Sequence, residues 1–284
     1  MKFARFSKGG QVRVGLVDDD SRRVRALAPS VPDIGHLIAD GNAGTPPADG
    51  EWLTFDAVRF LAPFRATPRN IICVGKNYRE HAREFARSGF EAGATVDVDP
   101  FPAVFTKPAT CIVGTGDKVD LHPEVTQAVD YEIELALIVG KGGRGIRKAD
   151  AYSHIWGYMI INDVTARDRQ KNHKQWFLGK ALDTFCPMGP WVATADEVDA
   201  ENLELNCWVN GELRQSANTR DLIFDIPTLI ESISSGMALL PGDIIATGTP
   251  SGVGIGFNPP KFLRPGDEVK MSITGLGTLT NTFA

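Results

Sequence analysis

The chain has 284 residues, enough for one large domain or for a large domain with a small companion. Hydrophobic residues make up 43% and charged residues 23%, a normal balance for a globular protein with a core. The net charge of −5 and the lack of any Lys/Arg-rich run exclude a typical nucleic-acid-binding protein. The N-terminus has no apolar signal core and no apolar run is long enough to span a bilayer, so we expect a cytoplasmic protein without a membrane partner. The four cysteines are far apart in the sequence, without a C-x-x-C motif, which predicts free thiols.

Residues 1–66 are predicted to form a small N-terminal domain that contains β-strands. A strand over residues 12–17, a turn over 18–21 and a return strand over 23–27 are expected, followed by a Gly/Pro-rich loop over 41–50. No catalytic constellation occurs in this part. We therefore interpret it as a cap or an oligomer-packing domain, and assign the chemistry to residues 67–284.

The second domain is dominated by predicted strands. A short strand over 71–74 precedes a helix over 77–87, and residues 88–102 are aperiodic and read as a mobile surface loop. Asn210-Gly211 predicts a hairpin turn, and residues 225–240 predict the best helix of this half. Many short strands with few helices favour a mixed β fold with some α, rolled or sandwiched, over a doubly wound sheet.

The strongest chemical signal is the acidic start of an apolar run over residues 130–139. On one strand, Asp130, Glu132 and Glu134 would share a face, because alternate side chains point the same way. Like charges on one face repel, and a hard divalent cation would compensate for them. The alternative is a solvated strand face that lies opposite lysines.

A second apolar run, over residues 157–162, stops at Asp163. A buried strand that ends in an aspartate can deliver the carboxylate to a cleft. Together with the two glutamates it would suit an oxygen-rich Mg²⁺ or Mn²⁺ site. A turn or capping role for Asp163 is equally compatible with the sequence.

Five further residues are candidates for proton transfer or substrate binding. His81 and Glu84 would share a helix face, where the carboxylate can orient the imidazole as a general base. Lys180 would stabilise an oxyanion if it is partly buried, and Arg167 and Gln170 would lie beside Asp163. The alternatives are a surface His–Glu pair, an exposed lysine and a solvated polar turn.

Taken together, these pieces resemble the fumarylacetoacetate hydrolase family from about residue 70 to residue 282. The resemblance rests on the order and spacing of five motifs: CVGKNYREH (73–81), DYEIEL (130–135), NDVTARD (162–168), GK (179–180) and TGTPSGVG (247–254). It implies a rolled mixed-β catalytic domain and a homodimer.

The resemblance also implies roles for individual residues. Glu132, Glu134 and Asp163 would hold Mg²⁺ or Mn²⁺, and His81 with Glu84 would form a dyad on a lid segment. Lys180 would stabilise developing negative charge, and Arg167, Gln170 and Thr249 would hold substrate oxygens. One departure is that Val74-Gly75-Lys76 carries no acid, whereas the founding members have an additional acidic ligand just upstream of the histidine. This favours the branch that handles smaller, acylpyruvate-like acids.

The expected activity is metal-dependent hydrolysis of a C–C bond in a small 2,4-dioxo acid, through an enolate. His81 would activate water, and the hydroxide would attack the distal carbonyl. The same residues would also serve an oxaloacetate decarboxylase or tautomerase, or a 2-hydroxy-diene-dioate isomerase. A catalytically silent scaffold is the alternative from a different class, although it would need none of these residues.

Overall fold

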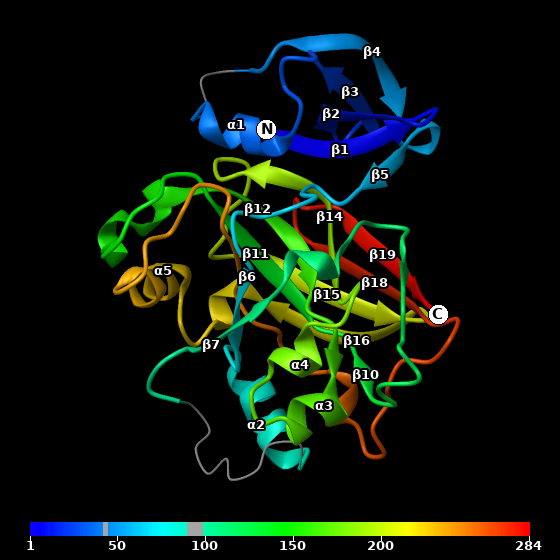
Figure 1. Cartoon of the computed structure of the whole chain (residues 1–284), viewed down its shortest axis with the longest axis vertical. Helices are drawn as coiled ribbons and strands as arrows, with labels where there is room; N and C mark the ends of the chain where they lie inside the picture. Colours follow the sequence, from blue (N-terminus) through cyan, green and yellow to red (C-terminus); the bar gives the residue numbers. More distant parts are fainter. Residues whose placement is uncertain (42–44, 90–98) are drawn as a thin grey trace.

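The computed structural model describes residues 1–41, 45–89 and 99–284. Its main element is a twelve-stranded sheet that extends from β4 at the top of Figure 1 to β7 in the lower half of the molecule. The order along the main path is β4 (Ala48–Thr54), β3 (Arg23–Leu27), β2 (Gln11–Asp18), β1 (Lys2–Lys8), β14 (Cys186–Thr194), β12 (Ile155–Asn162), β11 (Ile133–Val139), β17 (Ile244–Ala246), β6 (Ile71–Gly75) and β7 (Ala103–Lys107). Two short strands branch from this path, β5 (Arg59–Leu61) on β1 and β8 (Ile112–Val113) on β14.

Two smaller sheets and a few short helices complete the fold. The five-stranded sheet has the order β16 (Glu212–Asn218), β15 (Glu204–Val209), β18 (Glu268–Ile273), β19 (Thr278–Phe283) and β9 (Lys118–Val119), and β10 (Val129–Asp130) pairs with β13 (Thr165–Ala166). The α-helices are α1 (Ile34–Ala39), α2 (Arg79–Arg87), α3 (Arg167–Asn172), α4 (Phe177–Lys180) and α5 (Ile226–Ser234). The predicted mixed β architecture with some α is therefore confirmed.

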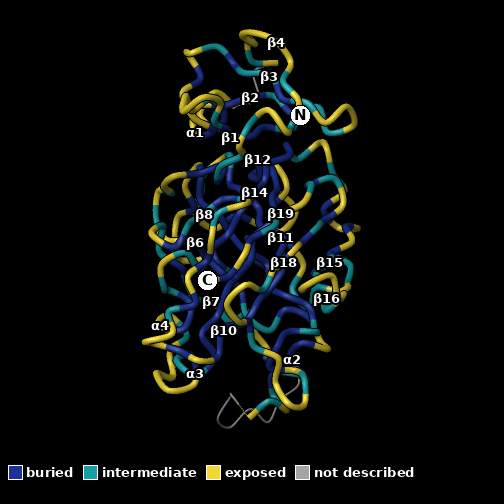
Figure 2. Tube along the Cα trace, turned by 90° about the vertical axis from the view of Figure 1, so that its right-hand side faces the viewer, coloured by how far each residue is buried: buried dark blue, intermediate teal, exposed yellow. Residues whose placement is uncertain are grey.

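The central strands are apolar along their whole length because both faces of the sheet are covered. In β11, Leu135 and Leu137 belong to one hydrophobic core, whereas Ala136 and Ile138 belong to another on the opposite face. Buried residues accordingly gather along the middle of the molecule (Figure 2). Glu134 lies two residues before Ala136, so the acidic residues leave the strand on the second of these faces.

The N-terminal strands extend the central sheet. β1 pairs with β14 through Lys2 opposite Ala193 and Phe3 opposite Val192, and Trp191 packs among the apolar side chains of β1–β3. The proposed boundary at residue 66 falls between β5 and β6, whereas the hydrogen-bonded sheet crosses it through β1 and β14. The cap role of this part and the homodimer stay predictions.

Several element boundaries differ from those expected from the sequence. The helix expected over 225–240 ends at Ser234, because Ser235 and Gly236 follow and favour termination. The helix expected from residue 77 begins at Arg79, and the loop expected over 41–50 gives way to β4 at Ala48. The predicted hairpin at residues 210–211 is confirmed between β15 and β16. Residues 42–44 of that first loop and 90–98 of the second lie outside the described residues.

Among the residues that the structure describes, the longest α-helices are α2 and α5, with nine residues each. Within the described ranges, no helix has the length and apolar character that a membrane crossing requires.

Candidate active site

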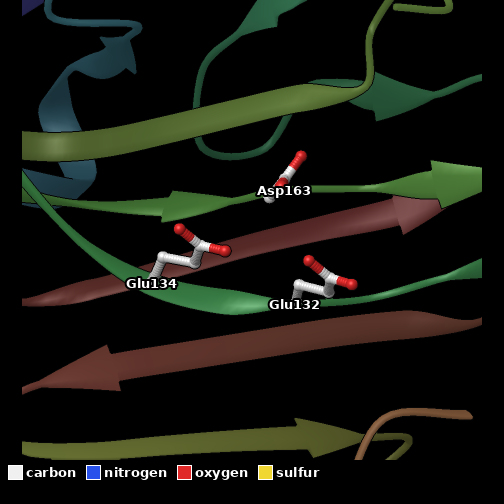
Figure 3. A group of neighbouring side chains, drawn as sticks. All are labelled: Glu132, Glu134 and Asp163. Carbon is white, nitrogen blue, oxygen red and sulfur yellow. The ribbon is translucent and has the colours of Figure 1, made fainter. Parts of the chain in front are cut away.

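Three buried carboxylates meet where β11 begins and β12 ends (Figure 3). Glu132 precedes β11, Glu134 lies within it, and Asp163 follows β12 directly. The antiparallel register sets Glu134 opposite Ile161, and the Asp163 amide donates a 2.9 Å hydrogen bond to the carbonyl of Glu132. The three side chains therefore share one face, and each offers a carboxylate oxygen within 4.8 Å of the others.

Two buried lysines neutralise part of this negative charge. Lys180, at the end of α4, places Nζ 2.7 Å from Glu132 Oε2 and 2.7 Å from Asp163 Oδ2. Lys107, at the end of β7, lies 2.7 Å from Asp163 Oδ1 and donates to the backbone carbonyls of Val164 and Lys180. The sequence reasoning missed Lys107, although a lysine inside a β-forming run, directly before a proline, was a usable signal.

Asp130 does not continue the acidic face, which corrects the expectation of a single strand over 130–139. β10 pairs with β13 and ends at Asp130. The next strand, β11, begins only at Ile133, where it pairs with β12. The Asp130 carboxylate accepts hydrogen bonds from the amide of Gly254 (2.6 Å) and from Arg167 Nε (2.8 Å). Arg167 in turn lies 2.7 Å from Glu132 Oε1, so Asp130 positions an arginine that holds a candidate ligand.

The charges of this buried cluster do not cancel. With every group ionised, four acids face three cations, which leaves one negative charge: Asp130, Glu132, Glu134 and Asp163 against Lys107, Arg167 and Lys180. Glu134 takes part in no ion pair with any described residue, and burial, with the carboxylates of Asp163 and Glu132, raises its pKa well above the usual range. Burial also opposes ionisation of Glu132, but Lys180, Arg167 and His81 outweigh it and lower the pKa of that carboxyl to about 2.

His81 and Glu84 form the expected pair on α2. His81 is 4% exposed, and its Nδ1 lies 3.2 Å from Glu84 Oε2. Glu84 is itself fixed, because the amide of Gly252 donates to its Oε1 over 3.0 Å. Gly256 makes room for this carboxylate, since a Cβ there would lie 1.8 Å from Glu84 Oε1. The alternative of a surface pair is therefore wrong.

The loop after β17 closes another side of the site. Gly248 adopts φ +106°, and its amide donates a 2.8 Å hydrogen bond to Glu134 Oε2. This positive φ favours glycine, since other residues would be strained there. Thr249 Oγ1 accepts a 2.8 Å hydrogen bond from the side-chain amide of Gln215 on β16, a contact that sequence reasoning did not foresee.

These groups surround one small pocket of about 280 Å³, counting the space at its open mouth. Carboxylates, cations and aromatic rings all contribute to its wall: Val74, Gly75, Lys76, His81, Phe85, Phe105, Glu132, Glu134, Arg167, Gln170, Trp176, Lys180 and Thr249. All the predicted catalytic and substrate-binding residues except Glu84 are thus lining residues, and Glu84 supports His81 from behind. The lid segment implied by the family resemblance, which we take to run from about residue 79 to 102, is described only over 79–89 and 99–102, and its motion stays a prediction.

The donor set fits a hard divalent cation. Carboxylate oxygens are the ligands that Mg²⁺ and Mn²⁺ prefer, and three of them converge in a buried position. Glu134 has no ion-pair partner among the described residues, so its carboxylate is the group that an additional positive charge would stabilise most. Lys180 and Lys107 already contact two of the acids, so a cation would share these ligands with the lysines.

Comparison with known proteins agrees with the geometry. Residues 70–284 match the family described as fumarylacetoacetate (FAA) hydrolase, C-terminal, and residues 1–63 match the family described as Rv2993c-like, N-terminal. The oxaloacetate tautomerase YisK of Bacillus subtilis (strain 168) is 45% identical, with 99% of each chain covered.

Two solved structures are also similar. The fumarylacetoacetate hydrolase EaFAH from psychrophilic Exiguobacterium antarcticum is 42% identical with a TM-score of 0.87, covering 100% of this chain and 99% of that one. The maleylpyruvate hydrolase from Sphingobium sp. SYK-6, in complex with manganese(II) ion and pyruvate, is 31% identical with a TM-score of 0.78, over 100% and 99% of the two chains. These enzymes share the sheet-dominated fold, and the first family match alone spans most of the chain. The chain therefore belongs to the fumarylacetoacetate hydrolase family.

Proposed function

We propose that this protein is a divalent-metal-dependent enzyme that interconverts the keto and enol forms of a small 2-oxo acid, with oxaloacetate as the substrate. One observation carries the proposal: His81, backed by Glu84, lines the same small pocket as Glu132 and Glu134, and the Asp163 carboxylate lies beside these two glutamates. The 45% identity to an oxaloacetate tautomerase over 99% of both chains supports this reaction ahead of the C–C hydrolysis expected from the sequence.

Glu132, Glu134 and Asp163 would hold the Mg²⁺ or Mn²⁺ ion. When bound, the ion would supply positive charge that draws electron density from the 2-oxo group and acidifies the neighbouring carbon. Lys180 and Arg167 keep Glu132 ionised through contacts of 2.7 Å each, so this ligand stays ready to coordinate.

His81 would carry the proton. With Nδ1–H donated to Glu84, the ring presents Nε2 as its basic nitrogen. In the keto-to-enol direction, Nε2 would take a proton from carbon 3, the C–H electron pair would become the C2–C3 double bond, and the C=O π pair would move to the 2-oxygen, which takes a proton from water while His81 releases its own to water. In the reverse direction the enol oxygen would give its proton to water and protonated His81 would deliver one to carbon 3. Glu84 acts as a positioning residue, because it contacts the imidazole and lies outside the pocket lining.

Gln170 and Thr249 would orient the substrate. The Gln170 carbonyl oxygen accepts from Arg167 Nη1 over 3.2 Å, and its amide nitrogen donates to no described residue. Thr249 Oγ1 accepts from Gln215, which leaves its hydroxyl hydrogen for donation. Both residues therefore offer donors to the oxygen atoms of a bound oxo-acid. Arg167, expected to bind substrate, instead contacts Asp130 and Glu132, so its direct role stays a proposal.

Hydrolysis of an acylpyruvate is the second candidate. The same His81–Glu84 pair would activate water instead of carbon 3, and the maleylpyruvate hydrolase relative supports this chemistry for the fold. Decarboxylation of oxaloacetate would follow if the distal carboxylate left as CO₂. The products separate the three outcomes: tautomerisation conserves every carbon atom, decarboxylation releases CO₂ and pyruvate, and hydrolysis consumes an acylpyruvate.

The test follows loss of the oxaloacetate enol by ultraviolet absorbance, with Mg²⁺, while lactate dehydrogenase reports pyruvate. Acetylpyruvate is assayed in parallel. We expect metal-dependent enol loss without matching pyruvate, and a decrease of about 10²–10⁴-fold in His81→Ala, the usual contribution of a general base. His36→Ala is the matched control, because His36 faces Asp33 at the same three-residue spacing but is exposed.

Three results would contradict the proposal. An unchanged enol rate in His81→Ala would remove the proton carrier. Stoichiometric pyruvate, or faster turnover of acetylpyruvate, would favour decarboxylation or hydrolysis. If no substrate responds to metal, the catalytically silent scaffold becomes the better account.

A further inference from the structure

Lys76 is a pocket-lining cation to which the proposed reaction gives no role. It adopts φ +53°, a left-handed conformation that is uncommon for a residue with a side chain. The turn that carries it is fixed on both sides. Gly75 packs against the Trp176 ring, where a Cβ would approach to 2.1 Å, and the buried side chain of Asn77 donates a 2.8 Å hydrogen bond to the carbonyl of Thr247.

The ion pair of Lys76 with Asp99 differs in kind from the ion pairs of the other pocket cations. Arg167 and Lys180 contact carboxylates of the buried cluster. Lys76 Nζ instead lies 2.8 Å from Asp99 Oδ2, and the Asp99 side chain is 41% exposed. A pair with so exposed a carboxylate is screened by water and salt, so another carboxylate can replace it readily.

We propose that Lys76 binds the distal carboxylate of the substrate and that Asp99 occupies this place until substrate arrives. The inference rests on the proposed function, because that function places the 2-oxo end of the substrate at Glu132, Glu134 and Asp163. Lys76 and these glutamates line one pocket of about 280 Å³, so a short acid held at the glutamates would share the pocket with the Lys76 side chain. The site would therefore select 2-oxo diacids over monoacids of equal length.

Exchange of Asp99 for substrate makes two variants act in opposite directions. Lys76→Met removes the cation and should weaken recognition of a diacid alone. Asp99→Asn removes one competing carboxylate while keeping its size, and should strengthen diacid binding. Lys174→Met is the matched control, because Lys174 also has a positive φ (+59°) but is exposed and lies outside the pocket lining.

The kinetic experiment compares oxaloacetate with its 4-methyl ester, which has a neutral distal group. Hydrogen bonds to charged groups contribute enough that we expect Lys76→Met to lower kcat/KM for oxaloacetate by at least about tenfold, mainly through KM. The ester should be unaffected. Asp99→Asn should lower the KM for oxaloacetate, and Lys174→Met should change neither substrate. An unchanged oxaloacetate-to-ester ratio in Lys76→Met would overturn the inference and leave the proposed reaction standing.

A binding experiment separates this inference from the reaction itself. Calorimetry with Mg²⁺ compares malate with 2-hydroxybutanoate, two unreactive acids that differ by a distal carboxylate against a methyl group. The wild type should bind malate more tightly, and Lys76→Met should bind the two acids equally. If the wild type lacks turnover but Lys76→Met still loses the preference for malate, the reaction is wrong and the carboxylate site stands. Equal binding of both acids by the wild type would overturn the site.

Discussion

Replacement of Lys107 by methionine tests how the buried lysines compensate the negative charge of the carboxylate cluster. Burial works against the charged form of Lys107, but Asp163 outweighs it and raises the pKa of the ammonium group, so the lysine is a buried cation. Lys107→Met keeps similar volume but leaves Asp163 with less compensation. Removing one partner of a buried ion pair costs about 3–5 kcal/mol. At about 2.1 cal/mol/K per residue, 284 residues unfold with about 0.6 kcal/mol/K, so we expect Tm to fall by about 5–8 °C.

Binding of a divalent metal should restore part of the stability that Lys107→Met loses. A divalent cation would take over the compensation of Asp163, so it should bind more tightly to Lys107→Met than to the wild type. If the cation binds the variant about tenfold more tightly, saturating metal raises the variant's free energy of unfolding by about 1.4 kcal/mol more than that of the wild type. Its Tm then rises by roughly 2 °C more than the wild-type Tm does. Differential scanning calorimetry with and without Mg²⁺ measures both effects. Lys118→Met, an exposed strand lysine, should stay within about 0.5 kcal/mol of wild type. Equal metal-induced shifts in Lys107→Met and wild type would refute this reasoning.

Three more predictions concern the ligands, the dyad and the thiols. Glu134→Ala should abolish Mn²⁺ binding in calorimetry with the fold retained, whereas the exposed Glu124→Ala should bind normally; unchanged affinity would remove Glu134 from the ligand set. Gly256→Ala should displace Glu84 and lower turnover, whereas Gly236→Ala, where a Cβ meets open space, should not; equal rates would show that Glu84 need not be fixed. Burial raises the pKa of all four buried thiols, so native protein should resist iodoacetamide near pH 8 and react only after unfolding, and rapid native labelling would contradict this burial.

The local parts of the site could be predicted from the sequence because they depend on short-range patterns. Glu132 and Glu134 start an apolar strand, Asp163 ends another, and His81 with Glu84 follows helical spacing. The strand patterns survive in the structure because burial on both faces of the sheet enforces them, and the helical pair survives because α2 places His81 and Glu84 side by side. The motifs at 130–135 and 162–168 then meet through the antiparallel pairing of β11 and β12.

The parts that sequence reasoning missed depend on contacts between distant segments. Lys107 reaches the site because β7 lies beside α4, so that its ammonium meets Asp163 and the carbonyl of Lys180. Asp130 does not lie on the same face as Glu132 and Glu134, because β10 pairs with β13 and not with β12. The junction of β1 with β14 joins residue 2 to residue 193. A local sequence pattern does not reveal which residues of two distant segments will pair, so these contacts could not be predicted.

Proton NMR of oxaloacetate in D₂O with Mg²⁺ tests the central claim most directly. One spectrum reports both deuteration at carbon 3, through loss of the methylene signal, and any pyruvate, through its methyl signal. We predict that the protein accelerates deuteration while pyruvate forms at its spontaneous rate, and that EDTA or Glu134→Ala returns deuteration to the uncatalysed rate. Deuteration that is unaffected by the protein, or accelerated equally without metal, would contradict the account.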